Sequence, residues 1–495
     1  MKKNKLVFNT SSSLLLQITT VLCGFILPKL LLSYFGSEIN GLVTSVTQFL
    51  QMIALLELGV GSVVQSELYK PLAEKNDTKT SEIVSSANKF FKTLAYILIV
   101  YVIVLIIIYP IVVNSSFDFI FTATLILAMS ISSFSQYYIG VVDRLLLTAD
   151  QRGYIQYNAQ TITLILNMIA TIILIKLGGS IQVVKLTTSI IYLVRPFFLR
   201  WYVNKHYNIN RKIKYEEEPI KQKWNGVAQH IAAMILDGTD VIVLTLFSSL
   251  ADVSVYSIYY MVVNGVKQLS ISLTHGIQAL LGELWAKQDL EKLNETFSWT
   301  EWIIHTGTVF LFGCTATLIV PFVQVYTNGV NDVNYIKPIF ALLLTTAYAC
   351  HCLRLPYNLM ILASGHYKQT QRCHIIAALI NLCVSILTVK HYGLIGVAIG
   401  TFAALIYQTI WMAYYSSKNL VRWPFTRFFK QILVDIIIVL VSFVMIKMLG
   451  TLSCISLIEW IILACKCVII WFISILGINL VFYRSNIIRI IKKIR

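Results

Sequence analysis

Two aspartates three residues apart lie in an otherwise apolar part of this sequence, Leu236-Asp237-Gly238-Thr239-Asp240. If the segment is helical, this spacing places both carboxyl groups on one face. Two like charges so close together favour protonation of one of them, which suits exchange of a proton or a cation. The alternative is a helix break at Gly238, where backbone groups satisfy both aspartates. The first interpretation predicts an ion-coupling site.

A solitary acidic residue, Glu57, lies in a second apolar segment. A carboxyl group buried in such a segment is either paired or protonated. Glu57 is therefore a third candidate for ion coupling, with structural pairing as the alternative.

Lys267 lies near the centre of another apolar segment, beside two amide side chains. A lysine at that depth cannot easily extend to the membrane surface, so it predicts a hydrated cavity that holds an anion. Tyr256 and Tyr260, with Tyr259 between them, begin the same segment. Their rings can stack on sugars, and the alternative is a belt of interfacial aromatic residues.

Four further basic residues lie closer to the ends of apolar segments: Lys29, Arg195, Arg200 and Arg354. Substrate contact and extension of the side chain to the membrane surface are both open for Lys29 and Arg195, whereas Arg200 fits the second role. We take Arg354 as a further substrate-binding candidate. A proline follows Arg195 directly and Arg354 two residues later, which predicts a local opening of each helix.

The elements that must position these residues are membrane spans. The 495 residues are 57% hydrophobic and 13% charged, with a mean hydropathy of +0.73. Since roughly 20 apolar residues cross the hydrocarbon as a helix, the sequence predicts an all-α polytopic membrane protein with about 14 such helices. The expected spans are residues 10–32, 41–64, 90–113, 119–142, 157–174, 181–203, 226–247, 255–281, 302–323, 336–361, 373–389, 394–415, 428–449 and 457–482.

The distribution of basic residues predicts the orientation of these spans. The net charge is +17, with 40 Lys and Arg. If both termini are cytoplasmic, about 32 of these residues fall on the inner side, as the positive-inside rule requires. The surplus charge therefore reflects topology and attraction to anionic headgroups, and we expect no nucleic-acid partner. The basic start and the apolar stretch after it have no clear cleavage site, so we expect an uncleaved first span.

A weak internal repeat predicts the domain organisation. The longest charged interruption, residues 204–224, follows the sixth span, and similar short motifs recur at similar intervals before and after it. We expect a six-helix lobe over residues 1–210, a cytoplasmic linker over 211–224, a second six-helix lobe over 225–420 and an appended helix pair with a basic tail over 421–495. The lobes would be parallel repeats around a central cavity.

Short loops and missing catalytic motifs indicate transport and not catalysis. The sequence contains no P-loop, zinc-protease motif, nucleophile elbow or dinucleotide fingerprint, and its loops are too short to form a folded extramembrane domain. The clusters Cys350-His351-Cys352 and Cys465-Lys466-Cys467 could be metal ligands, but packing of small side chains explains them better. We therefore expect no enzyme and no metal centre.

Several short motifs resemble polysaccharide repeat-unit flippases of the O-antigen type, the Wzx-like members of the multidrug/oligosaccharidyl-lipid/polysaccharide exporter superfamily. These motifs are residues 27–29, 34–42, 56–61, 147–152, 240–244 and 253–257. In this comparison Lys29 matches the basic residue after proline in the opening motif. Asp240 matches the acidic residue of the seventh span.

The resemblance implies a bacterial inner-membrane protein that flips an undecaprenyl-diphosphate-linked oligosaccharide to the outer face by alternating access. An H⁺ or Na⁺ gradient would supply the energy, without a cofactor. Membrane lipids, and the polymerase and chain-length regulator of the same pathway, would be partners. Multidrug or other small-molecule cation antiporters and lipid-linked peptidoglycan precursor flippases of the same superfamily remain alternatives. A scaffold role and a membrane polymerase are more distant ones.

Overall fold

The computed structural model describes residues 2–57, 59–113, 117–215, 217–220, 227–272, 274, 277–448, 450 and 454–494. Helices account for 87% of the structure, and these ranges contain no strand. Eleven helical segments within them are long and apolar enough to cross a membrane. The first of the eleven, Val7–Glu57, contains the first predicted span and most of the second. The described residues of the fourteen predicted spans lie largely in helices, and some spans, such as 41–64, 119–142 and 336–361, are divided between successive helical elements. This confirms the all-α polytopic fold.

The chain divides into two compact units. Unit 1 comprises Met1–Met234 with Ser249–Ser254, and unit 2 comprises Ile235–Ser248 with Val255–Arg495. The appended helix pair expected from the sequence therefore belongs to the same compact unit as the second set of spans.

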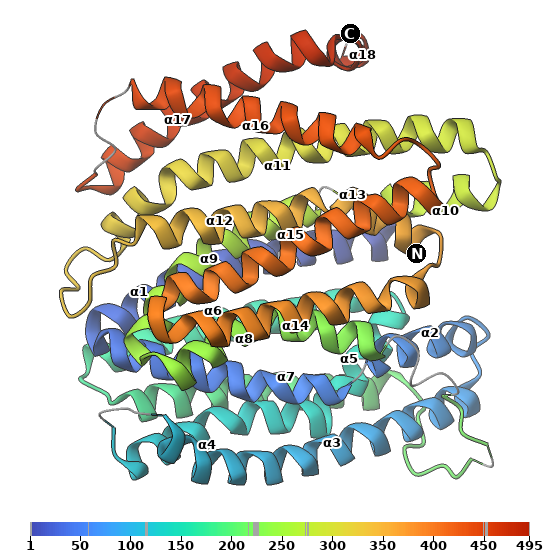
Figure 1. The fold of residues 1–495 in the computed structure, drawn as a ribbon. Helices are drawn as coiled ribbons and strands as arrows, with labels where there is room; N and C mark the ends of the chain where they lie inside the picture. The colour runs from blue at the N-terminus through green and yellow to red at the C-terminus, as the bar shows by residue number, and fades with distance from the viewer. Residues whose placement is uncertain are drawn as a thin grey trace. The chain divides into compact units, whose positions relative to one another are not determined.

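Unit 1 is a bundle of long helices that run side by side (Figure 1). Its closest pairs are α1 with α6, α4 with α7, and α6 with α7. Helix α1 contains a kink at Gly36, whose φ of 82° favours glycine. The elements are α1 (Lys2–Gln51), η1 (Met52–Glu57), α2 (Val60–Ala73), α3 (Asp77–Val112), α4 (Phe119–Ser135), η2 (Gln136–Gly140), α5 (Val141–Ala149), α6 (Gly153–Lys176) and α7 (Ile181–His206).

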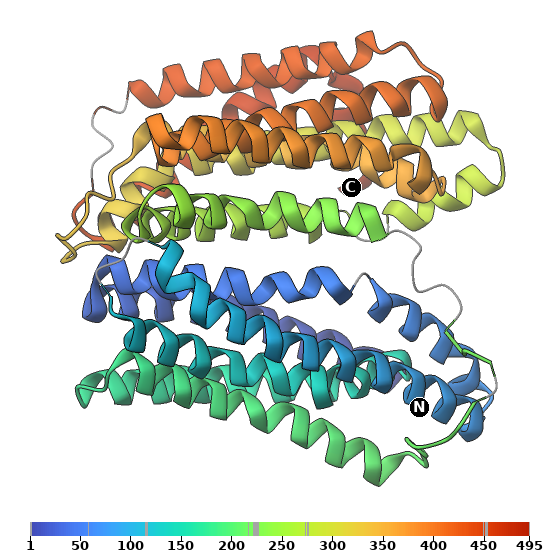
Figure 2. The same ribbon diagram turned by 60° about the horizontal axis from the view of Figure 1, so that its bottom comes forward.

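Unit 2 contains the remaining helices, and its closest pair is α14 with α15 (Figure 2). Gly396 and Gly400 allow this approach, because a Cβ at Gly400 would lie 2.1 Å from Ser385 Oγ. The elements are α8 (Val227–Phe247) and α9 (Leu250–Ser272), whose first residues belong to unit 1, then α10 (Ile277–Ala286), α11 (Leu290–Tyr326), α12 (Pro338–Leu353), α13 (Leu355–Ala363), α14 (Tyr367–Tyr392), α15 (Leu394–Asn419), α16 (Thr426–Lys447), α17 (Leu457–Phe482) and α18 (Arg484–Ile494).

Helices α16 and α17 pack against α11 within unit 2. Trp471 of α17 is fully buried, and its indole occupies the space where a Cβ at Gly313 would lie. The indole also donates a hydrogen bond to Thr317 on α11. The appended pair is thus fixed to the bundle by a large aromatic side chain that fits against a glycine.

The two proline predictions have different outcomes. Helix α12 ends at Leu353 and α13 begins at Leu355, so the opening expected before Pro356 is confirmed. Helix α7 instead continues through Pro196 to His206, and the opening expected there is wrong. The π-helical turn η2 packs against Pro196 at Gly140, and such tertiary contacts allow a proline to remain inside a membrane helix.

Candidate ion and substrate site

Asp240 is buried in unit 2, with only 2% of its surface exposed. Helix α8 runs without interruption from Val227 to Phe247, so the alternative of a helix break at Gly238 is wrong. Tyr256 on α9 donates a hydrogen bond of 2.9 Å to Asp240 Oδ2. The Thr401 hydroxyl on α15 lies 2.9 and 2.7 Å from the two carboxyl oxygens.

Asn381 on α14 extends this oxygen-rich cluster. Its amide nitrogen lies 3.4 Å from Asp240 Oδ1 and 3.0 Å from Thr401 Oγ1. Its amide oxygen accepts a hydrogen bond of 2.6 Å from Thr239. Three helices, α9, α14 and α15, thus bring neutral donors to the carboxyl group on α8. Because a carboxylate, hydroxyls and an amide oxygen are the groups that hard cations prefer, this cluster can exchange a proton or a small cation.

Of the other two ion-coupling candidates, the structure describes the side chain of only one, Glu57. The side chain of Asp237 is outside the described residues. Glu57 ends the 3₁₀ helix η1 in unit 1, and a Cβ at Gly61 would lie 2.8 Å from its Oε1. The second predicted span is therefore not one regular helix: it is α1, then η1, then α2, with Glu57 at the interruption.

Three tyrosines in mutual ring contact continue from Asp240 into unit 2. The Tyr256 and Tyr260 rings stack with their centroids 5.6 Å apart, and Tyr260 meets Tyr348 edge to face at the same distance. Tyr256 is almost fully buried, whereas Tyr260 is half-buried. Tyr259 has a different role, because its hydroxyl donates to the backbone of Tyr335.

Lys267 lies at the other end of this aromatic series. Its side chain is 4% exposed, and its ammonium lies 5.2 Å from the centroid of the Tyr348 ring. A cation in this position is stabilised by the electron-rich ring face. Lys267 and Asp240 are therefore at opposite ends of one connected set of side chains.

Arg354 is also buried in unit 2, at the interruption between α12 and α13. It donates hydrogen bonds to Gln408 on α15 and, at 3.2 Å, to His351. Gln408 in turn lies 3.0 Å from His374 Nδ1. Lys267, Arg354 and two histidines thus form a basic region inside unit 2, of which sequence reasoning had found the two cationic residues.

The two basic candidates of unit 1 are both half-buried. Lys29 lies on α1, next to Pro28. Arg195 on α7 donates a hydrogen bond of 2.6 Å to Gln136 in η2, and it lines a cavity of about 390 Å³ between α6 and α7.

Arg200, expected to extend to the membrane surface, is paired with an acidic side chain in the structure. It forms an ion pair of 2.5 Å with Asp143, whose side chain is completely buried. Arg211, from the segment after α7, forms a second ion pair of 2.6 Å with the same carboxylate. Burial lowers the pKa of Arg211, and Asp143 acts in the opposite direction. This pairing anchors the segment after α7 to unit 1.

Among the described residues, no group of three or more His, Cys, Asp or Glu side chains is arranged to hold a metal ion. The residues missed by sequence reasoning are mainly neutral partners of the predicted charges: Thr401, Asn381, Gln408 and Tyr348. Only single polar residues inside apolar runs could have indicated them, without revealing which helices meet.

No family model and no curated protein matches this sequence. Solved structures share its fold. The lipid II flippase MurJ, in an inward closed conformation, gives a TM-score of 0.71 at 17% identity, over 96% of this chain and 100% of that chain. An inward-facing multidrug resistance MATE family transporter of the MOP superfamily gives 0.61 at 13% identity, over 83% of this chain and 98% of that one.

A third structure, a MOP superfamily transporter from Pyrococcus furiosus, gives a TM-score of 0.59 at 14% identity, over 85% of this chain and 97% of that one. At such identities the likeness defines the fold. This chain therefore has the fold of MOP superfamily transporters, a class of multi-pass membrane proteins. Of the three structures, that of the flippase covers the largest share of this chain.

Proposed function

We propose that this chain is an ion-coupled flippase for an anionic lipid-linked glycan of the bacterial inner membrane. The observation that carries the proposal is the buried basic region around Lys267 and Arg354 in a chain with this transporter fold. Basic residues within the membrane segments of a transporter are candidates for binding an anionic substrate. A diphosphate headgroup supplies the complementary charge, while its polyprenyl chain remains in the lipid.

The extent of the fold supports a lipid-linked substrate. The flippase structure covers 96% of this chain, whereas the two transporter structures cover 83% and 85%. The part of this chain that the two transporter structures do not cover is about as long as helices α16–α18 together. The undecaprenyl-diphosphate-linked repeat unit of an O-antigen, capsule or exopolysaccharide is our preferred substrate. The corresponding peptidoglycan precursor is the nearest alternative.

Each basic candidate has a role in this proposal. Lys267 and Arg354 bind the diphosphate from unit 2, and Lys29 and Arg195 bind it from unit 1 in another step of alternating access. Tyr260 is half-buried and stacks on a sugar ring. Tyr256 donates its hydroxyl proton to Asp240, and its ring stacks on Tyr260. Protonation of Asp240, or ion binding to it, would therefore shift Tyr256 and the tyrosine rings next to it.

Asp240 is the ion-coupling residue of this proposal, with Asp237 and Glu57 as further candidates. Its neutral donors from α9, α14 and α15 can reorient when a proton or Na⁺ binds. Ion binding would then change how these helices pack. The ion would bind one packing arrangement more tightly than the other, and this difference in affinity is what drives a conformational change. We further propose cytoplasmic termini and cooperation with the polymerase and chain-length regulator of the pathway.

The proposal is tested by flipping of a fluorescent undecaprenyl-diphosphate oligosaccharide in proteoliposomes, with and without an ion gradient. We expect Lys267→Ala to abolish flipping and Asp240→Asn to abolish its dependence on the gradient. Lys466→Ala is the matched control, because Lys466 also lies in the middle of a membrane helix but is exposed. Equal loss of activity in both lysine variants would contradict the assignment of Lys267.

The second candidate function is export of small cationic molecules, which the shared fold of the MATE family transporter favours. Transport of cationic dyes, without flipping of any lipid-linked glycan by folded protein, would establish it in place of the flippase.

A further inference from the structure

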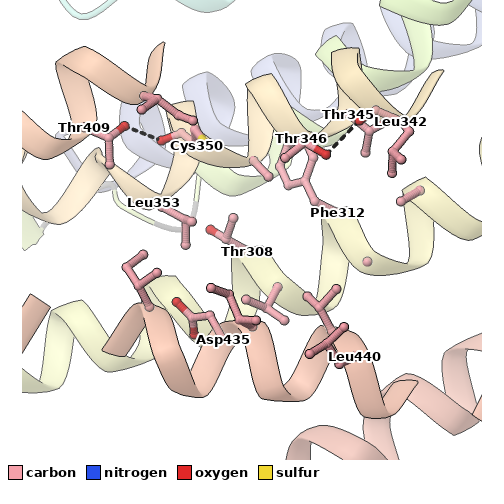
Figure 3. A pocket seen from close by; sticks show the side chains of 18 of the residues that line it. Thr308, Phe312, Leu342, Thr345, Thr346, Cys350, Leu353, Thr409, Asp435 and Leu440 are labelled. Atoms are coloured by element: carbon pink, nitrogen blue, oxygen red, sulfur yellow. Dashed lines mark hydrogen bonds between the residues drawn. The ribbon is translucent and has the colours of Figure 1, made fainter. Parts of the chain in front are cut away.

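A cavity of about 450 Å³ lies in unit 2 between α11, α12, α15 and α16. Its wall consists mostly of apolar side chains, and Asp435 of α16 is the one acidic residue among those that line it. Figure 3 shows the Asp435 carboxyl group directed toward Thr308 and Leu353. A carboxyl group at such a position is costly unless a partner compensates its charge.

The partner of Asp435 is His305 on α11, which is completely buried. The distance between His305 Nδ1 and Asp435 Oδ2 is 2.7 Å. The other ring nitrogen faces the Tyr357 hydroxyl at 3.5 Å, and the imidazole also makes a hydrogen bond to the backbone of Leu353. Gln431, one turn before Asp435, donates to its second oxygen at 3.1 Å.

The groups around the ring accommodate two protons on the pair. The Tyr357 hydroxyl donates its own proton to Glu301 at 2.5 Å, which leaves its oxygen as an acceptor for a proton on His305 Nε2. The short contact on the other side of the ring requires a second proton between Nδ1 and the Asp435 carboxyl group. The geometry is therefore that of a pair carrying one dissociable proton.

The surrounding charges fit this proton count. Glu301 supplies a second carboxyl group on α11, and Arg427 of α16 acts on it electrostatically. Tyr483, after α17, also faces the cluster, and Lys430 lies over its ring at 5.8 Å. Arg427 itself is exposed and lies over the Trp423 ring. With the proton bound, His305 compensates the buried Asp435; without it, two buried carboxyl groups, Glu301 and Asp435, face a neutral imidazole.

We propose that His305 and Asp435, together with Glu301, form a proton-binding site separate from Asp240, and that its bound proton stabilises the packing of α16 against α11. The two sites share no residue, and this one ties an appended helix to the bundle. Loss of the proton leaves Asp435 facing a neutral imidazole and repelled by Glu301, which weakens that contact.

The first test is nitrogen NMR of the histidine rings in the isotope-labelled full-length chain in detergent, recorded over a range of pH. The His305 signals are identified by their disappearance in His305→Gln. We expect both ring nitrogens of His305 to be protonated at low pH and one of them to lose its proton on titration. A ring that stays singly protonated throughout would overturn the proposal.

The second test is the pH dependence of unfolding for wild type, Asp435→Asn and Glu295→Gln. The folded pair holds a proton that an exposed histidine loses near pH ~6.5. Stability is therefore complete below that pH and falls as pH rises, by up to about tenfold in the folding equilibrium constant per pH unit. Asp435→Asn should reduce this slope. Glu295→Gln, a change at an exposed position of α11, the helix that carries His305, should keep it. Equal slopes in wild type and Asp435→Asn would refute the site.

Discussion

Two buried aspartates, Asp143 in unit 1 and Asp240 in unit 2, have opposite surroundings. Both are almost inaccessible, with 0% and 2% of their surfaces exposed. Asp143 is held by two guanidinium groups, those of Arg200 and Arg211. The donors that reach Asp240 from α9, α14 and α15 are neutral: a phenol, an amide and a hydroxyl.

This difference fits a structural role for Asp143 and the ion-coupling role that we propose for Asp240. Asp143 is paired with two guanidinium groups that come from α7 and from the segment after it, so this carboxylate holds that segment against unit 1. Neutral donors stabilise the Asp240 carboxylate less, and they can turn toward a bound cation or around a protonated carboxyl group. The type of partner, and not burial, therefore separates the two roles.

The largest effect that the comparison predicts is on stability, from Asp143→Ala. Removal of the carboxylate leaves two partly buried arginines facing each other, and we expect a loss of about 3 kcal/mol in unfolding free energy. Denaturant unfolding in detergent measures it. Asp77→Ala, at an exposed position on α3, is the control and should cost less than about 1 kcal/mol. Similar losses of unfolding free energy in both variants would show that Asp143 has no special structural role.

Asp240→Asn is expected to affect transport far more than stability. The amide is isosteric and can keep most hydrogen bonds, so the stability change should stay within about 1 kcal/mol. Gradient-driven flipping should fall at least ~10-fold, which corresponds to the loss of about 1.4 kcal/mol in ion coupling. Flipping in proteoliposomes with and without the gradient measures this. A destabilisation as large as that of Asp143→Ala would make Asp240 a structural residue as well.

The fold could be predicted from the sequence because membrane spans depend on a strong local signal, a long apolar run. Breaks inside the spans were harder to predict. Pro356 marked one correctly, but the continuity of α7 through Pro196 depends on contact with η2, which is distant in the sequence. The interruption at η1 depends likewise on tertiary contacts.

The charged members of the candidate site were predictable because an ionisable residue in an apolar run is conspicuous. Their partners were not, since Asn381 and Thr401 contact Asp240 only through the packing of α14 and α15. The sequence also contained an overlooked signal. His305 and Asp435 lie within predicted spans and are subject to the same energetic cost as Asp240.

Thr401→Val should weaken ion coupling more moderately and identify the ion. The Thr401 hydroxyl contacts both oxygens of Asp240, and a hydrogen bond to a charged group contributes about 1.5 to 3 kcal/mol. If Na⁺ is the coupling ion, its half-maximal concentration should rise about tenfold. If the ion is a proton, loss of the donor favours the protonated carboxyl group, and the half-maximal pH of transport should move upward.

Thr401→Ser is the matched control, because it keeps the hydroxyl and should behave like wild type for either ion. Unchanged ion dependence in Thr401→Val would mean that the neutral donors do not contribute to ion binding at Asp240. The difference between the partners of Asp240 and those of Asp143 would then not explain their different roles.

The smallest predicted effect is that of Arg211→Gln, which tests whether the two arginines of the Asp143 cluster are redundant. Arg200 still compensates the carboxylate in this variant and also donates to the backbone of Ile139. We therefore expect a loss of only about 1 kcal/mol, close to that of a partly exposed ion pair, and almost none for the exposed neighbour Lys212→Gln.

The double variant Asp143→Ala with Arg211→Gln should be no less stable than Asp143→Ala alone, because an arginine without its carboxylate gives no stabilisation. Additive losses would show that Arg211 stabilises unit 1 by some other contact, and that Asp143 depends on Arg200 alone.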